Sequence, residues 1–209
     1  YYSLFGDKIS KIGVESLDEA LRRLEHYPIF VSEILELTAY ILSNLDKKTY
    51  SVGEGMPATL EQYGCYTREE VFAIFGRQTA EERMQGSVAG AVDIKGLNTE
   101  LFFVTLNKSD KDFSAKTMYN DYVVSEYEFH WESQNTDSHT GKGQRFVKQK
   151  ENGKKFLLFV RENKRDGFGN TCPFICFGLI DYISSKGDKP MKINWQMHHP
   201  ILPRFLNVV

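Results

Sequence analysis

The sequence predicts an α+β fold in which a helical N-terminal segment precedes a mostly antiparallel β-barrel. Apolar residues recur at helical spacing in the first 45 residues and again after Tyr66. From Val88 onward they alternate in the manner of β-strands. The chain has 209 residues, 41% hydrophobic and 26% charged, which suits one medium domain or a small domain with an appendage.

Two helices are expected in the first part of the chain. In SLDEALRRLEHY, Ser16 is a candidate N-cap and Glu19 completes a capping box, while Pro28 ends or kinks the helix. The next helix, IFVSEILELTAYILSNLD, carries an apolar stripe that we expect to pack on a neighbouring helix. The stripe consists of Ile34, Leu37, Ile41 and Leu45.

A turn or linker, VGEGMPA at residues 52–58, separates these helices from the rest of the chain. In YTREEVFAIFG, Thr67 and Glu70 form a second capping box and Gly76 stops the helix. We therefore expect a helical coupling segment at residues 1–60 and a barrel domain at residues 61–209.

About six strands are expected after Gly86. AGAVDIK and TELFFVTLN form a hairpin that turns at residues 96–98. Asn152-Gly153 predicts a second hairpin, and Lys186-Gly187-Asp188 a third. DYVVSEYEFHW is expected to be one strand, with the odd-numbered residues 123–131 on one face and the even-numbered residues 122–130 on the other.

The charge distribution permits a local anion-binding surface. The net charge is −2, but residues 139–166 hold nine Lys and Arg against three acids. Such a stripe can bind phosphates on an acidic protein because salt screens distant charges. A solvated hairpin would give the same pattern.

Catalytic and metal-site motifs are weak. The chain has no nucleophile elbow, P-loop, zinc-protease or dinucleotide-binding motif. Three cysteines indicate a reducing compartment, and the C-x3-C pair of Cys172 and Cys176 lacks the partners of a zinc site. Neither a membrane-spanning run nor a signal peptide is visible, and we expect an excised C-terminal piece of a longer protein.

The stretch from Leu106 to Asn135 is the densest candidate for a binding site. It joins strands by a long loop that is rich in amides, hydroxyls, acids and aromatic residues. Loops of this kind beside a rigid sheet commonly form binding sites. Taken singly, Tyr119, Tyr122 and Trp131 suit a core, but as a set they favour binding.

Five stretches resemble the C-terminal domain of a bacterial family that fuses a phospholipase-D-type nuclease and a superfamily 2 helicase to it. They are YTREEVFAIFG, FFVTLNKSDKDFSAKTMYNDYVVSEYEFHWESQN, GQRF, LLFVREN and KPMKINWQMHHPI. The resemblance runs from about Tyr63 to Pro200. Staphylococcal ATP-dependent type IV restriction endonucleases, which cut DNA containing modified cytosine, typify this family.

The resemblance implies an SRA-like barrel, related to PUA-like barrels, that flips 5-methylcytosine or 5-hydroxymethylcytosine into a pocket. It implies a bacterial cytoplasmic protein whose partners are double-stranded DNA and the upstream helicase and nuclease domains, with no membrane partner. A homodimer through the full-length protein is left open. The domain itself would be neither an enzyme nor a metal or cofactor site, since ATP and Mg²⁺ belong to the upstream domains.

A flipped cytosine needs aromatic faces, a hydrogen-bond acceptor for its amino group and an apolar niche for the methyl group. The candidate stacking residues are Tyr119, Tyr122, Phe129 and Trp131. Asp121 is the first candidate acceptor and Asp112 the second. The candidate DNA contacts are Asn107, Lys108, Ser109, Lys111, Lys116, Gln134, Asn135, Lys142, Arg145 and Lys148.

Three alternatives stay open at this point. The chain would act as a module that couples helicase to nuclease or mediates dimerisation, and the apolar stripe in its second helix favours this reading in part. It would otherwise bind RNA or unmodified single strands, as PUA-like barrels also do. A cryptic enzyme is the third alternative.

Overall fold

The computed structural model describes residue 5 and residues 8–44, 51–82, 89–94, 96–108, 120–139 and 141–206. The helices are α2 (Leu17–Leu24), α3 (Pro28–Asn44), α4 (Arg68–Ile74), α5 (Gly141–Val147), α6 (Gln149–Asn152) and the 3-10 helix η2 (Pro203–Phe205). The strands are β1 (Cys65–Tyr66), β2 (Ala91–Ile94), β3 (Thr99–Asn107), β4 (Tyr122–Ser125), β5 (Glu128–Glu132), β6 (Lys155–Asn163), β7 (Phe174–Lys186) and β8 (Lys192–Met197).

The strands form one mixed sheet in the order β2-β3-β6-β7-β8-β5-β4, with β1 paired to the start of β7. β3 and β6 run parallel, and the other pairs are antiparallel. The α+β prediction is confirmed. The closed barrel is wrong for the described part of the chain, because β2 and β4 end the sheet without pairing to each other.

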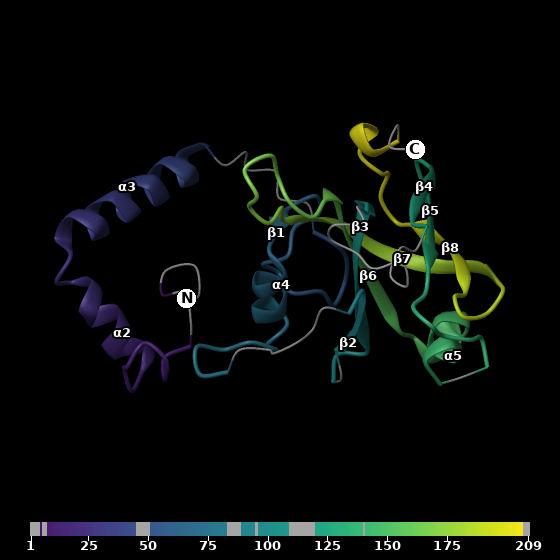
Figure 1. The fold of residues 1–209 in the computed structure, drawn as a ribbon, viewed down its shortest axis with the longest axis horizontal. Coiled ribbons are helices and arrows are strands. Elements are labelled where there is room, and N and C mark those ends of the chain that lie inside the picture. Colours follow the sequence, from purple (N-terminus) through teal and green to yellow (C-terminus); the bar gives the residue numbers. More distant parts are fainter. Residues whose placement is uncertain are drawn as a thin grey trace.

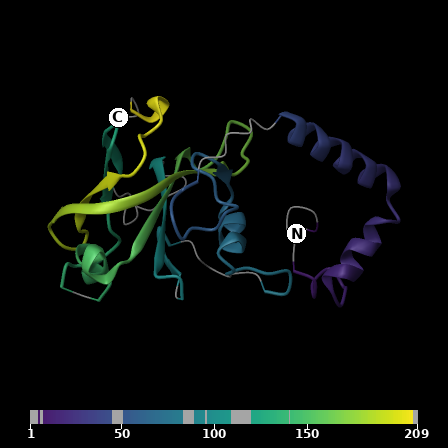
Figure 2. The ribbon, with the colours of Figure 1, turned by 180° about the vertical axis from the view of Figure 1, so that it is seen from behind.

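The sheet curls strongly around an inner core (Figures 1 and 2). Phe102 of β3 stacks on Trp131 of β5, with 4.5 Å between ring centroids, although three strands separate β3 from β5 in the sheet. Helix α5 covers this core with Phe146, whose ring meets those of Phe102 and Trp131 edge-on. Aromatic contacts of this kind stabilise a core beyond the area that they bury.

The opposite face of β3, β6 and β7 carries a second core. Helix α4 buries Val71 and Phe72 there, and Phe72 meets Phe103 of β3 edge-on. Val52 and Leu60 are buried in the same cluster, so the segment predicted as a linker packs against the sheet. The sheet is therefore covered on both faces where β3 and β6 pair.

Helices α2 and α3 form an arm that extends away from the sheet (Figure 1). Ser16 caps α2 as predicted, although the Glu19 carboxylate accepts from the amide of Glu15 rather than from that of Ser16. Leu37 and Ile41 of the predicted stripe are exposed, and Leu45 lies outside the described residues. No helix of the described part of the chain covers Leu37 or Ile41.

Two local predictions are wrong, the single strand at residues 121–131 and the hairpin at Asn152-Gly153. In each case the sequence pattern is compatible with more than one structure. The segment expected to be one strand is the β4–β5 hairpin, which turns at residues 125–127 without the glycine or proline that would signal a turn. Asn152-Gly153 ends α6 instead of forming a hairpin. Gly153 has φ 57°, the left-handed conformation that both a helix end and a tight hairpin require.

Other local predictions are confirmed. The Thr67–Glu70 capping box is present at the start of α4. The turn at residues 96–98 joins β2 to β3, and the turn after Lys186 joins β7 to β8. Within the described residues, seven strands follow Gly86, close to the expected number of about six.

Candidate nucleic-acid interface

The parallel strands β3 and β6 finish at the same edge of the sheet. Asn107 and Asn163 are register partners there, and Asn107 Nδ2 donates to Asn163 Oδ1 at 3.2 Å. The connection to β4 leaves this edge after Lys108, and the connection to β7 leaves it after Asn163. We call this edge the β3–β6 end. The carboxyl ends of parallel strands are frequent ligand sites in sheets of this kind.

Two arginines are fixed beside the β3–β6 end. Arg161 of β6 donates from Nε to Thr105 Oγ1 at 2.9 Å and from Nη1 to the Cys172 carbonyl at 3.1 Å. Its guanidinium lies 4.2 Å from the ring centroid of Phe174. The contact with the Phe174 ring and the two hydrogen bonds together fix the orientation of the Arg161 guanidinium plane.

The second arginine, Arg68, comes from α4. Its Nη1 donates to the Ala89 carbonyl at 2.9 Å, and its guanidinium lies 4.2 Å from the ring centroid of Phe103. Phe103 and Phe174 meet edge-on at 5.2 Å, so the two arginine–aromatic contacts belong to one stack. We call these four residues the arginine stack.

The arginine stack brings two guanidinium groups close to one pair of aromatic rings. The pKa of Arg68 is lowered to about 10, chiefly by burial and also by repulsion from the Arg161 charge, while Glu69 opposes the shift. The Arg68 guanidinium remains charged at neutral pH. Guanidinium groups favour anions such as phosphate, because their planar donors match its oxygens.

A buried ion pair fixes the connection that leaves β3. Lys108 Nζ lies 2.5 Å from Asp121 Oδ2, and the side chains are only 9% and 5% exposed. The other carboxylate oxygen of Asp121 accepts from the Glu132 amide at 2.9 Å. Burial raises the pKa of Asp121. The Lys108 charge and the hydrogen bond from the Glu132 amide partly offset this rise. Asp121 therefore ties β3 to the β4–β5 hairpin, and both of its oxygens are already engaged.

The structure separates the predicted stacking residues. Phe129 is fully buried and Trp131 is 3% exposed, so both belong to the inner core, the alternative that the sequence left open. Tyr122 lies on the outer face of the sheet, 38% exposed. Tyr119 and Asp112 lie outside the described residues.

Tyr122 stacks on His130, with 4.6 Å between ring centroids, and a hydrogen-bond chain fixes the tautomer of His130. Asn194 Nδ2 donates to Glu128 Oε1 at 2.7 Å, because a carboxylate only accepts. The amide oxygen of Asn194 therefore faces His130 Nδ1, 2.6 Å away. Nδ1 must carry the hydrogen, which leaves Nε2 of the neutral ring as an acceptor.

Residues 60–207 match the model of a family described as a domain of unknown function, DUF3427. The chain belongs to the DUF3427 family. The match covers the sheet, both of its cores and the β3–β6 end, whereas α2 and α3 lie before it. A comparison with curated proteins gives no match.

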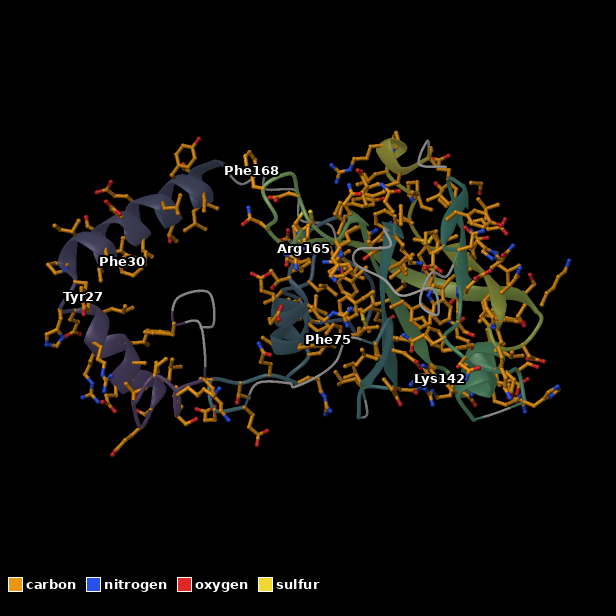
Figure 3. All side chains as sticks on the ribbon, viewed as in Figure 1. Tyr27, Phe30, Phe75, Lys142, Arg165 and Phe168 are labelled. Carbon is orange, nitrogen blue, oxygen red and sulfur yellow. The ribbon has the colours of Figure 1, made fainter. Side chains whose placement is uncertain are left out.

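The remaining predicted DNA contacts of the DUF3427 domain do not gather at the β3–β6 end. Lys142, Arg145 and Lys148 lie on α5 and its C-terminal end, and Figure 3 shows Lys142 far from Arg165 on the other side of the sheet. Arg145 pairs with the buried Glu100 at 3.2 Å. Burial lowers the pKa of Lys142.

Other predicted contacts have mixed environments. On the connection after β5, Gln134 is half-buried and Asn135 is exposed. Ser109, Lys111 and Lys116 lie outside the described residues. Among the described residues no group of three or more His, Cys, Asp or Glu is arranged to hold a metal, and none of the helices there is long and apolar enough to cross a membrane.

Sequence reasoning missed Arg68, Arg161 and His130 as site residues. Arg68 follows an N-cap, where a surface position is the ordinary expectation. Arg161 was counted in the basic stripe, but its position at the end of a buried strand beside β3 depends on a parallel pairing that no local pattern shows. Alternation placed His130 on the face opposite Phe129 and Trp131, but no sequence signal indicated its contacts with Tyr122 and Asn194.

Proposed function

We propose that this DUF3427 domain binds DNA at the β3–β6 end and acts as the recognition module of a larger, helicase-linked, ATP-dependent restriction protein. The observation that carries DNA binding is the arginine stack, in which Arg68 and Arg161 present two oriented positive charges at a strand end. The link to a restriction protein rests on the family resemblance. An SRA-like or PUA-like origin is part of the same proposal, and the strong curl of the sheet supports it.

Recognition of modified cytosine is the finer part of the proposal. Tyr122 supplies an exposed aromatic face, and we propose Nε2 of His130, a ring that is only 9% exposed beneath it, as the acceptor for the cytosine amino group. His130 takes this role in place of Asp121, whose oxygens are held by Lys108 and by the Glu132 amide. The cost of flipping a base, a few kcal/mol, would be offset by stacking on Tyr122 and by a hydrogen bond to His130.

The test is a titration of the chain with matched duplexes that carry cytosine, 5-methylcytosine or 5-hydroxymethylcytosine at fixed salt. Selective binding to a modified duplex is expected. Equal binding to all three contradicts modified-base recognition, and no binding contradicts the whole proposal. His130→Ala should remove selectivity while leaving general affinity.

A pair of variants then locates the DNA. Arg161→Gln should weaken binding to all duplexes and reduce the slope of log affinity against log salt by about 1, the value for one lost phosphate contact. Lys148→Ala, at the exposed end of α5, should change neither. If Lys148→Ala weakened binding and Arg161→Gln did not, the DNA would bind at α5 and α6 and not at the β3–β6 end.

A second function is favoured by α3. This helix exposes large apolar side chains along its length, namely Ile29, Leu35, Leu37, Tyr40 and Leu42. Such a surface is typical of a site that contacts another protein element. We propose coupling to the helicase or nuclease domains, or dimerisation, as the role of α3. Light scattering of the chain and of Leu37→Glu measures dimerisation directly, and a monomer in both would exclude it.

A further inference from the structure

An exposed phenylalanine stands at the tip of the connection between β6 and β7. Phe168 is 94% exposed, far more than the other aromatic side chains that the structure describes in the sheet domain. Figure 3 shows it at the outer end of this connection, with Arg165 nearer the sheet. Exposing a whole phenyl ring to water is unfavourable relative to burying it. We call residues 164–171 the Phe168 loop.

The Phe168 loop is held in one conformation by its own hydrogen bonds. Asp166 Oδ1 accepts from the amides of Phe168 and Asn170 at 2.9 and 2.8 Å, and Oδ2 accepts from Asn170 Nδ2 at 3.1 Å. These bonds, those from Asn170 above all, lower the pKa of Asp166. The left-handed φ of 87° at Gly169 lets the loop turn back, and Arg165 Nη1 donates to the Gly169 carbonyl at 3.0 Å.

The base of the loop is closed as well. Arg165 and Thr171 form a β-bridge, and the Cys172 amide donates to the Lys164 carbonyl at 3.1 Å. The ring of Phe168 is therefore presented by a preformed turn, and a ligand would meet it without the entropy cost of ordering the loop. No core contact of the described residues explains this presentation.

The neighbours of Phe168 indicate the kind of ligand. Gly167 and Gly169 on either side have no side chains, so both faces of the ring are open to a planar partner. The residues beyond them are polar, and Lys164 and Arg165 are cationic. A protein pocket usually buries a wider apolar patch, whereas a ring alone among polar groups suits the narrow space between stacked bases.

We propose that the Phe168 loop is a nucleobase-stacking element, in which the ring of Phe168 stacks on a base of DNA bound at the β3–β6 end. This inference rests on the proposed function. The loop leaves β6 from that same end, two residues after Arg161, so phosphates at the arginine stack and a base at Phe168 would belong to one DNA molecule. The Phe168 ring would take the place of a neighbouring base in the base stack of the DNA, beside a base pair that has opened.

The test measures the affinity of the chain for a short duplex that carries one 2-aminopurine, whose fluorescence rises when the base loses its stacked neighbour. Phe168→Ala should weaken binding between about 5-fold and about 100-fold, the range for losing one aromatic stacking contact. It should also abolish the rise in fluorescence. Phe168→Trp should keep both, and Phe168→Leu should lose both, because leucine is apolar but not planar.

The control is Leu97→Ala, which removes another exposed apolar side chain at the β2–β3 turn and should bind as the unaltered chain does. Normal binding by Phe168→Ala or Phe168→Leu would overturn the stacking role while leaving DNA binding intact. Failure of the unaltered chain to bind the duplex would instead overturn the proposed function, and the stacking role with it. Folding is not at issue, because the Phe168 ring is almost wholly in solvent.

Discussion

The two faces of β5 place neighbouring residues in opposite environments. Phe129 and Trp131 point into the inner core, where Trp131 stacks on Phe102. His130, between them, lies on the outer face beneath Tyr122 and is hydrogen-bonded to Asn194. The aromatic density of this stretch therefore has two sources. Phe129 and Trp131 build the inner core, whereas Tyr122 and His130 stack on the other face, where Tyr122 is 38% exposed and His130 only 9%.

The largest effect should come from the inner face. Trp131→Ala removes a ring that contacts Phe102 and Phe146, so the free energy of unfolding should fall by about 3–5 kcal/mol. Tyr122→Ala, on the outer face, is the matched control and should cost less than about 1 kcal/mol. Urea unfolding of both variants measures the difference, and equal losses would contradict the division between the two faces.

The next largest effect should come from the ion pair that joins these regions. Asp121→Ala leaves the Lys108 ammonium buried without its carboxylate, which should cost about 3 kcal/mol. Lys108→Met combined with Asp121→Ala removes the buried ammonium as well and should recover part of that loss. A double-mutant cycle by chemical unfolding gives the coupling, and purely additive losses would show that the pair contributes little.

A smaller effect is expected on the outer face. Asn194→Ala removes the acceptor that holds the hydrogen on His130 Nδ1, at a cost of about 1 kcal/mol. Long-range ¹H–¹⁵N correlation spectra should show the Nδ1–H tautomer in the unaltered chain and a mixture of tautomers in the variant. The Nε2–H tautomer in the unaltered chain would contradict the assigned acceptor.

The smallest perturbation is chemical labelling of the cysteines. Burial raises the pKa of Cys176 to about 12, so its thiol should resist alkylation at pH 8, whereas the exposed Cys65 should react. Mass spectrometry after brief exposure to iodoacetamide reads both sites. Rapid labelling of Cys176 would show that the second core opens far more readily than the structure indicates.

The features that sequence predicted correctly are those decided within a few residues. The Thr67–Glu70 capping box and the turn at residues 96–98 depend on contacts between near neighbours. The parallel pairing of β3 with β6 could not be predicted in this way, because its partners lie more than 50 residues apart. The arginine stack depends on that pairing and on the packing of α4, so it was hidden as well.

Local sequence patterns also could not show which face of β5 is buried in the core. Alternation correctly put Phe129 and Trp131 on one side of a strand and His130 on the other. It could not show which side was the core, because Tyr122 and His130 are aromatic too. The choice depends on the curl of the sheet, which brings Phe102 over Trp131.

The buried pair of Lys108 and Asp121 has a consequence for how the family can diversify. It joins the residue that follows β3 to the residue that precedes β4, so the points at which the connection leaves and rejoins the sheet are fixed. Doubling the length of such a connection costs only about 0.6 kcal/mol in closure entropy. We therefore expect the length of this connection to vary among family members more than its two anchored ends do.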